Sequence, residues 1–137
     1  MKDTIDEKIL QALKENARMT YVDIGRSVGL SEGAVRNRIQ ALVDSGVIRR
    51  FTIEVATSVG VRALTMISVD PSIPTSAVSE AVGRMNVVER IYEITGEYDI
   101  AIVVSSPDIE AVNRCIEEIR AVEGVVRTNT MIVLRTL

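Results

Sequence analysis

Residues 20–48 read TYVDIGRSVGLSEGAVRNRIQALVDSGVI and contain two short helical patterns joined by a turn. Thr20 and Ser31 are typical N-cap residues, and each stands at the start of one pattern. Gly29 and Gly46 stand where a residue with a left-handed backbone commonly ends a helix. Because Gly29 lies only two positions before Ser31, the turn is tight, and the stretch predicts a helix-turn-helix.

The second of these predicted helices has one apolar side and one polar side when successive residues are placed about 100° apart. Its apolar side consists of Val35, Ile39, Leu42 and Val43. Its opposite side carries Gly33, Asn37, Gln40 and Asp44, and its flanks carry Arg36 and Arg38. A helix that reads the DNA major groove needs short polar groups for the base edges and cations for the phosphate walls. The pattern therefore predicts that this helix binds double-stranded DNA.

Residues around this helix are suited to phosphate contacts. The free N–H groups that follow Ser31 are able to receive a phosphate, and Arg18 and the pair Arg49–Arg50 bracket the module. The predicted DNA-binding residues are Arg18, Ser31, Arg36, Asn37, Arg38, Gln40, Arg49 and Arg50. Glu32 and Asp44 lie close to them and are expected to limit non-specific affinity. The alternative interpretation is a solvated amphipathic helix that contacts no nucleic acid.

The composition excludes several classes of protein. The chain has 137 residues, of which 47% are hydrophobic, enough for one domain or two small ones with a real core. It has no His and a single Cys, which excludes most metal sites and most catalytic triads, so we expect no enzyme, no metal and no cofactor. Cys115 has the helical spacing of a core residue with Val112 and Ile119, which favours a packing role.

Charge is distributed unequally along the chain. Residues 1–50 contain nine Lys and Arg against seven Asp and Glu, residues 51–137 contain seven against twelve, and the net charge is −3. This asymmetry suggests two modules with different partners. The lone cysteine fits a reducing cytoplasm, and the sequence shows neither a signal-peptide pattern nor an apolar run long enough to cross a membrane. We therefore expect a cytoplasmic protein.

Beyond Gly60 the hydrophobic pattern changes. The expected elements are strands at 61–70, 87–95, 98–105 and 125–137, a short helix within 71–85, and a helix capped by Ser106 with Pro107 at its first position. The order β-α-β-β-α-β is that of the ferredoxin-like class. The predicted fold is α+β, with a helix-turn-helix domain at 1–50, an extended linker strand at 51–60 and a ferredoxin-like βαββαβ domain at 61–137.

A sheet of this class has helices on one face only, so its other face is open. Met66 and Ile102 are among the residues expected on the open face. Another subunit usually closes an apolar open face, which predicts a homodimer through residues 61–137. Such a dimer presents two recognition helices to a palindromic DNA site.

Residues 94–105 read ITGEYDIAIVVS and place a carboxylate on an otherwise apolar predicted strand. Gly96 and Glu97 fit a two-residue hairpin turn with Gly first. Asp99 is then in register with Ala101 and Val103, and a carboxylate on an apolar face is costly unless something pairs with it. Two interpretations are open: Asp99 caps a nearby loop, or it pairs with a ligand.

The sequence resembles one known family, the leucine-responsive/asparagine regulators (Lrp/AsnC). The segment LSEGAVRNRIQALVDSGVIRRF (30–51) is similar to the family's recognition segment, and residues 4–31 are similar to its first two helices. Residues 61–137 resemble its C-terminal effector domain, in which TGEYD matches the G-x-Y-D pattern at Gly96, Tyr98 and Asp99. One departure is Gly25, where the family usually has Ala, and this glycine is expected to loosen the helix by about 1 kcal/mol.

The resemblance implies a sequence-specific transcription regulator whose dimers assemble into larger rings, commonly octamers, and bind an amino acid effector between dimers. Asp99 would pair with the ammonium group of the amino acid, and backbone N–H groups near Gly96 would receive its carboxylate. Polar residues of the last strand would complete the pocket from a neighbouring dimer. The effector-binding residues implied are Gly96, Glu97, Tyr98, Asp99, Thr128, Asn129 and Thr130.

Two other functions remain open at this point. One is an architectural, nucleoid-type DNA-binding protein without an effector, against which the acidic second module argues. The other is a small-molecule-binding regulatory subunit. That function would leave the arginines that flank the predicted recognition helix unexplained.

Overall fold

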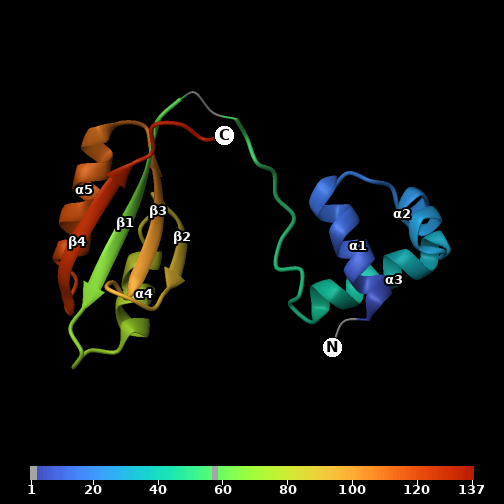
Figure 1. Ribbon diagram of the computed structural model, residues 1–137, viewed down its shortest axis with the longest axis horizontal. Coiled ribbons are helices and arrows are strands. Elements are labelled where there is room, and N and C mark those ends of the chain that lie inside the picture. The colour runs from blue at the N-terminus through green and yellow to red at the C-terminus, as the bar shows by residue number, and fades with distance from the viewer. Residues whose placement is uncertain (1–2, 57–58) are drawn as a thin grey trace. The chain divides into compact units, whose positions relative to one another are not determined.

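The computed structural model describes residues 3–56 and 59–137 (Figure 1). The chain divides into two compact units, Met1–Val55 and Ala56–Leu137, and the division falls inside the segment expected to be a linker. No helix in the described ranges is long and apolar enough to cross a membrane.

The first unit consists of three helices whose starts follow from their capping residues. They are α1 (Thr4–Glu15), α2 (Tyr21–Val28) and α3 (Glu32–Asp44). The side chains of Asp3, Thr20 and Ser31 each accept a hydrogen bond from the backbone N–H three residues ahead, which satisfies one free donor of each helix. Gly29 ends α2 with a φ of 75°. The predicted helix-turn-helix is therefore confirmed, with both predicted N-caps in place.

Each of the three helices contributes to one small core. Ile9 of α1, Ile24 of α2 and Val35 and Ile39 of α3 are buried and pack together. Three of the four residues predicted for the apolar side of α3 are buried, namely Val35, Ile39 and Leu42, whereas the fourth, Val43, is exposed. On the opposite side of the helix Asn37 and Gln40 are exposed.

Gly25 allows the turn between α2 and α3 to pack closely. A Cβ atom on Gly25 would lie 2.3 Å from the carbonyl oxygen of Leu30, and the Leu30 N–H donates to the Gly25 carbonyl at 2.9 Å. The residue is buried. The propensity cost of Gly25 in α2 thus has a structural counterpart, because the absent side chain makes room for the backbone of the turn.

The second unit is a four-stranded antiparallel sheet with two helices on one face (Figure 1). Its elements are β1 (Val61–Val69), α4 (Thr75–Gly83), β2 (Val88–Glu93), β3 (Ile100–Ser106), α5 (Ile109–Arg120) and β4 (Val125–Ile132). The strand order is β2-β3-β1-β4, with all three pairings antiparallel. This topology confirms the predicted ferredoxin-like fold.

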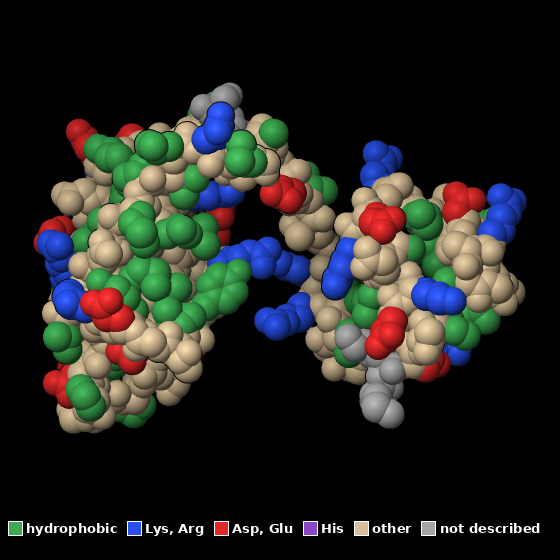
Figure 2. All heavy atoms as spheres, viewed as in Figure 1, with side chains coloured by type: hydrophobic (Ala, Val, Ile, Leu, Met, Phe, Trp, Pro, Cys, Tyr) green, Lys and Arg blue, Asp and Glu red, His purple; other side chains and the backbone are tan. Residues whose placement is uncertain are grey.

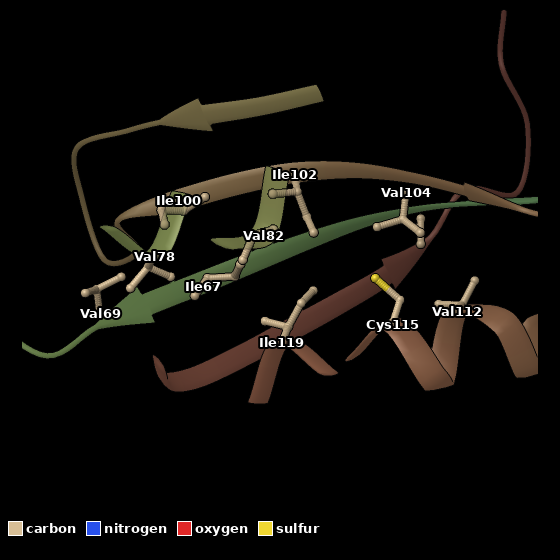
Figure 3. Packing of buried hydrophobic residues seen from close by; sticks show 11 residues of the cluster. Ile67, Val69, Val78, Val82, Ile100, Ile102, Val104, Val112, Cys115 and Ile119 are labelled. Carbon is tan, nitrogen blue, oxygen red and sulfur yellow. The ribbon is translucent and has the colours of Figure 1, made fainter. Parts of the chain in front are cut away.

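The core of this unit lies between the sheet and the two helices (Figure 3). Strand residues such as Ile67, Ile100 and Val104 meet Val82 of α4 and Ile119 of α5 there. The side chain of Cys115 points toward the sheet and is buried, as its spacing predicts (Figure 3). Burial raises the pKa of the Cys115 thiol, which disfavours the reactive thiolate.

The register of β1 and β3 decides which residues face away from the helices. Met66 pairs with Ala101 and lies on the open face, whereas Ile102 pairs with Thr65 and is 1% exposed on the helix-covered face. The prediction for Met66 is confirmed and the one for Ile102 is wrong. Side chains alternate along a strand, so Ile102 and Ala101 necessarily lie on opposite faces.

The start of α5 and the connector also differ from expectation. Asp108, not Ser106, caps α5, because its carboxylate accepts a hydrogen bond from the Ala111 N–H at 2.8 Å. Ser106 instead ends β3, and its hydroxyl donates to the Asp108 carbonyl oxygen. In the predicted linker strand, residues 51–56 form neither helix nor strand within this chain, and residues 57–58 lie outside the described residues.

Candidate nucleic-acid interface and effector site

The polar side of α3 is the candidate DNA-reading surface of the first unit. Asn37 is exposed there, and the Gln40 side chain, also exposed, donates to the Asp44 carboxylate at 2.8 Å. This bond leaves the carbonyl oxygen of Gln40 free to accept from a base edge. Ser31, at the N-terminus of α3, uses its hydroxyl oxygen as the helix cap, accepting from the Ala34 N–H at 3.2 Å.

Arg36 is held by two neighbours. Its Nη2 lies 2.8 Å from Oε1 of Glu32, one turn earlier on α3, and its guanidinium lies 5.6 Å from the centre of the Tyr21 ring. The Arg36 side chain is 58% exposed, so a DNA phosphate or base is able to reach it. Contact with DNA through this guanidinium requires it to leave Glu32 or to share its donors.

Arg38 connects α3 to the start of α1. Its Nη1 lies 2.7 Å from Oδ2 of Asp3 and 3.0 Å from Oδ1 of Asp6. Asp3 uses its other oxygen to cap α1, by accepting from the Asp6 N–H. The Arg38 guanidinium, together with this cap, holds the pKa of the Asp3 carboxyl below its usual value. Arg38 was predicted to hold a phosphate, but in the structure its guanidinium is occupied by two carboxylates of α1.

Three predicted phosphate-binding residues lie outside the helices. Arg18 lies in the turn after α1, and Arg49 and Arg50 follow α3. All three are exposed, and none forms an ion pair within residues 3–56 and 59–137. Figure 2 shows Lys and Arg side chains projecting from the first unit. Exposed guanidiniums of this kind are the groups best suited to bind phosphates.

The candidate effector site is the loop between β2 and β3. The Ile94 N–H donates to the Asp99 carbonyl oxygen at 2.9 Å, which closes a loop of residues 95–98. The predicted two-residue turn is therefore wrong, although Gly96 does have the positive φ, 108°, expected of a turn glycine. The longer loop reaches further from the sheet than a two-residue turn would.

Asp99 lies before β3 and not on it, which resolves the question of a carboxylate on an apolar face. Its N–H donates to the Ile67 carbonyl at 2.9 Å, and its Oδ2 accepts from the Val69 N–H at 2.7 Å. Asp99 thus joins the loop to the end of β1. Among the described residues its other carboxylate oxygen, Oδ1, accepts no hydrogen bond, so one half of the carboxylate is already anchored and the other is unused.

Arg127 of β4 completes this site and was not found from the sequence. Its Nη2 lies 2.8 Å from Oε1 of Glu97, and its guanidinium lies 5.0 Å from the centre of the Tyr98 ring. The contact spans thirty positions in the chain, so no local pattern indicates it. It holds the loop against the edge strand and brings a cation and two carboxylates, those of Glu97 and Asp99, to one end of the sheet.

The three predicted residues of β4 do not share one side. Thr130 lies on the helix-covered side, where its hydroxyl is 2.9 Å from that of Thr65, and Thr128 accepts from Arg120 of α5 at 3.3 Å. Asn129 pairs with Met66 on the open face. A hollow of about 370 Å³ lies at this end of β4 and is lined by Arg120, Val125, Val126, Arg127 and Thr128. Thr128 therefore lines this hollow beside Arg120, whereas Thr130 is engaged in the core.

Comparison with known proteins gives matches to both units. Residues 2–49 match a family model described as winged helix-turn-helix DNA-binding, and residues 62–137 match the Lrp/AsnC ligand binding domain. The HTH-type transcriptional regulator LysM of Saccharolobus solfataricus is 45% identical over 134 residues, which cover 98% of this chain and 94% of that protein.

Solved structures agree with the family models. The leucine response regulatory protein LrpA of Mycobacterium tuberculosis has a TM-score of 0.86 at 27% identity, covering 98% of this chain and 94% of that one. The regulator NMB0573 of Neisseria meningitidis, solved as a complex with L-Met, has a TM-score of 0.80 at 25% identity, covering 98% and 91%. The helix-turn-helix, the ferredoxin-like unit and these matches lead to one conclusion: the chain belongs to the Lrp/AsnC family of DNA-binding transcription regulators.

Proposed function

We propose that this regulator binds a palindromic DNA site as a homodimer, and that an amino acid bound at residues 96–99 changes how the dimers assemble, up to an octamer. The observation that carries the proposal is the state of Asp99. One carboxylate oxygen is fixed by the Val69 N–H at 2.7 Å, and the other has no partner among the described residues. A carboxylate held in this way is ready to accept an ammonium group without reorganising.

The surroundings of Asp99 suit the rest of an amino acid. Backbone N–H groups around Gly96 are available for the carboxylate of the ligand, and Gly permits a close approach to the backbone. Arg127 offers a cationic group for the ligand carboxylate, beside Tyr98. Asn129 offers a polar side chain on the open face of β4. Thr128 and Thr130 lie on the other face, where their hydroxyls contact Arg120 and Thr65. The L-Met complex of the Neisseria meningitidis relative supports an amino acid as the ligand class.

The open face of the sheet is the proposed dimer interface. Leu64 is 41% exposed, Tyr92 49% and Met131 44%, and Met66 and Val103 lie between them on the same face. Figure 2 shows hydrophobic side chains gathered over the strands of the second unit. A continuous apolar face of this kind is usually covered by another subunit, and a second copy places a second α3 for the other half of a palindrome.

Effector control then follows from assembly. If an amino acid favours one arrangement of dimers, it changes the spacing of the recognition helices and hence the affinity for DNA. Couplings of this type are typically about 1–3 kcal/mol, which corresponds to a change of roughly 5- to 150-fold in DNA affinity.

The proposal is tested by a thermal-shift screen of the twenty amino acids with the wild-type protein and with Asp99→Ala. A ligand that binds only the folded state raises the melting temperature by mass action. We expect at least one amino acid to stabilise the wild type and to leave Asp99→Ala unchanged, while both bind DNA. Glu80→Gln is the matched control, because Glu80 is an exposed carboxylate on α4 that pairs with Arg84. An unchanged response in Asp99→Ala refutes the assignment.

A footprint separates the proposed regulator from an architectural protein. One short protected palindrome supports the regulator, whereas uniform coverage supports DNA packaging.

A further inference from the structure

Within the described part of the chain, both cations of the DNA-reading helix are paired. Arg36 and Arg38 are the basic residues of α3, and each contacts a carboxylate of the first unit, Arg36 that of Glu32 at 2.8 Å and Arg38 that of Asp3 at 2.7 Å. Glu32 and Asp44 balance the two arginines, so α3 has no net charge. Unpaired cations on a helix that enters a DNA groove increase the non-specific affinity for DNA. Because both arginines of α3 are paired, α3 lacks this contribution.

Three arginines without an ion pair among the described residues lie at the two ends of the helix-turn-helix. Arg18 precedes α2, and Arg49 and Arg50 follow α3. These three are exposed, and the described part of the chain offers none of them an ion-pair partner. Phosphate-binding and base-reading groups are therefore separated along the first unit.

We propose that Glu32 is a specificity-determining residue, which keeps the Arg36 guanidinium from phosphates of unmatched DNA. Asp3 and Asp6 do the same for Arg38, so that the sequence-independent attraction to DNA resides in Arg18, Arg49 and Arg50. This inference rests on the DNA-binding surface proposed above, and it changes the roles of Arg36 and Arg38 within it.

Competition for one guanidinium is the physical basis. A phosphate that approaches Arg36 must displace a carboxylate already in contact at 2.8 Å or share the guanidinium with it, and in both cases it approaches that negative charge. The Tyr21 ring adds a second hold, at 5.6 Å from the guanidinium. Only a DNA sequence whose base edges form hydrogen bonds with α3 compensates for the lost contact between Arg36 and Glu32. Removing Glu32 therefore increases the affinity for unmatched duplexes more than the affinity for the matched duplex.

The test measures the salt dependence of binding to a mixed-sequence duplex by fluorescence anisotropy. The slope of log K against log salt has a magnitude of about 0.9 per phosphate neutralised, and each substitution acts twice in a dimer. We expect Arg49→Gln to lower that magnitude by about 2 and Arg36→Gln to leave it unchanged. We expect Glu32→Gln to raise the mixed-sequence affinity by about threefold or more. Arg36→Gln that lowers the slope as much as Arg49→Gln overturns the proposal.

A matched control separates the role of Glu32 from simple charge removal. Glu15→Gln removes one exposed negative charge of α1, which accepts from a Gln11 amide and forms no ion pair among the described residues. Glu15→Gln should raise the mixed-sequence affinity clearly less than Glu32→Gln does, and equal increases overturn the proposal. Selection of a site from random DNA with the wild type provides the matched duplex, on which Glu32→Gln should lower the ratio of matched to mixed-sequence affinity. A wild type that binds no duplex at all refutes the DNA-binding surface itself, a result distinct from equal slopes.

Discussion

Replacing Gly25 with Ala is expected to destabilise the first unit. Helix propensity alone predicts a gain of about 0.8–1.0 kcal/mol, because Ala is the better helix former. The structure opposes this gain, since the new Cβ would lie 2.3 Å from the Leu30 carbonyl oxygen. That oxygen belongs to the backbone of the turn and does not move away as the end of a flexible side chain would.

The magnitude follows from the shift that the turn must make. Cβ contacts shorter than 3.0 Å are essentially never seen, so Leu30 must withdraw by at least the difference from 2.3 Å. Overpacking of this size costs about 1–3 kcal/mol. The withdrawal also strains the 2.9 Å bond from the Leu30 N–H to the Gly25 carbonyl, and breaking a hydrogen bond costs about 0.5–1.5 kcal/mol more. After the propensity gain is subtracted, the net loss is about 0.5–3.7 kcal/mol.

The assay is amide hydrogen exchange of the full chain, read on peptides from residues 21–44, because exchange reports the opening free energy of one region. Gly33→Ala is the matched control. Gly33 is an exposed residue of α3, and an added Cβ there meets nothing within 4 Å, so we expect stabilisation by up to about 1 kcal/mol. If Gly25→Ala slows exchange as Gly33→Ala does, the close approach of the Leu30 carbonyl does not destabilise a side chain at position 25, and the reasoning is refuted.

Two further predictions concern the N-terminus and the open face. The pKa of Asp3 is lowered in the folded protein, so its contribution to stability is present above the unfolded pKa, near 3.8, and is lost as the pH falls through the lower folded pKa. Asp3→Asn should remove this acid-dependent loss of stability, measured as amide hydrogen exchange of α1 and α3 at a series of pH values. An unchanged pH dependence contradicts the pairing of Asp3 with Arg38. Leu64→Glu places a charge on the open sheet face and should convert the proposed dimer to a folded monomer in analytical ultracentrifugation. Ile109→Glu on α5, where the side chain is already 55% exposed, should leave the proposed dimer intact.

Local chemistry accounts for the elements that were predicted well. Thr20 and Ser31 act through N–H groups three residues away, so their positions alone predict where α2 and α3 begin. The start of α5 was missed because Ser106 and Asp108 are both good caps and lie two residues apart. The pairing of β1 with β3 decides between them, because it places Ser106 opposite Val61 as the last residue of a strand.

Long-range contacts decide the chemistry of both sites. The sequence was sufficient to predict the helix-turn-helix and the ferredoxin-like topology, because periodicity, caps and glycine positions are local properties of a chain. It did not predict that Asp99 is anchored by Val69, that Arg127 holds the loop, or that Arg38 is occupied by Asp3. Those partners lie about thirty or more positions away, and only the packing of strands and helices brings such charges within hydrogen-bonding distance.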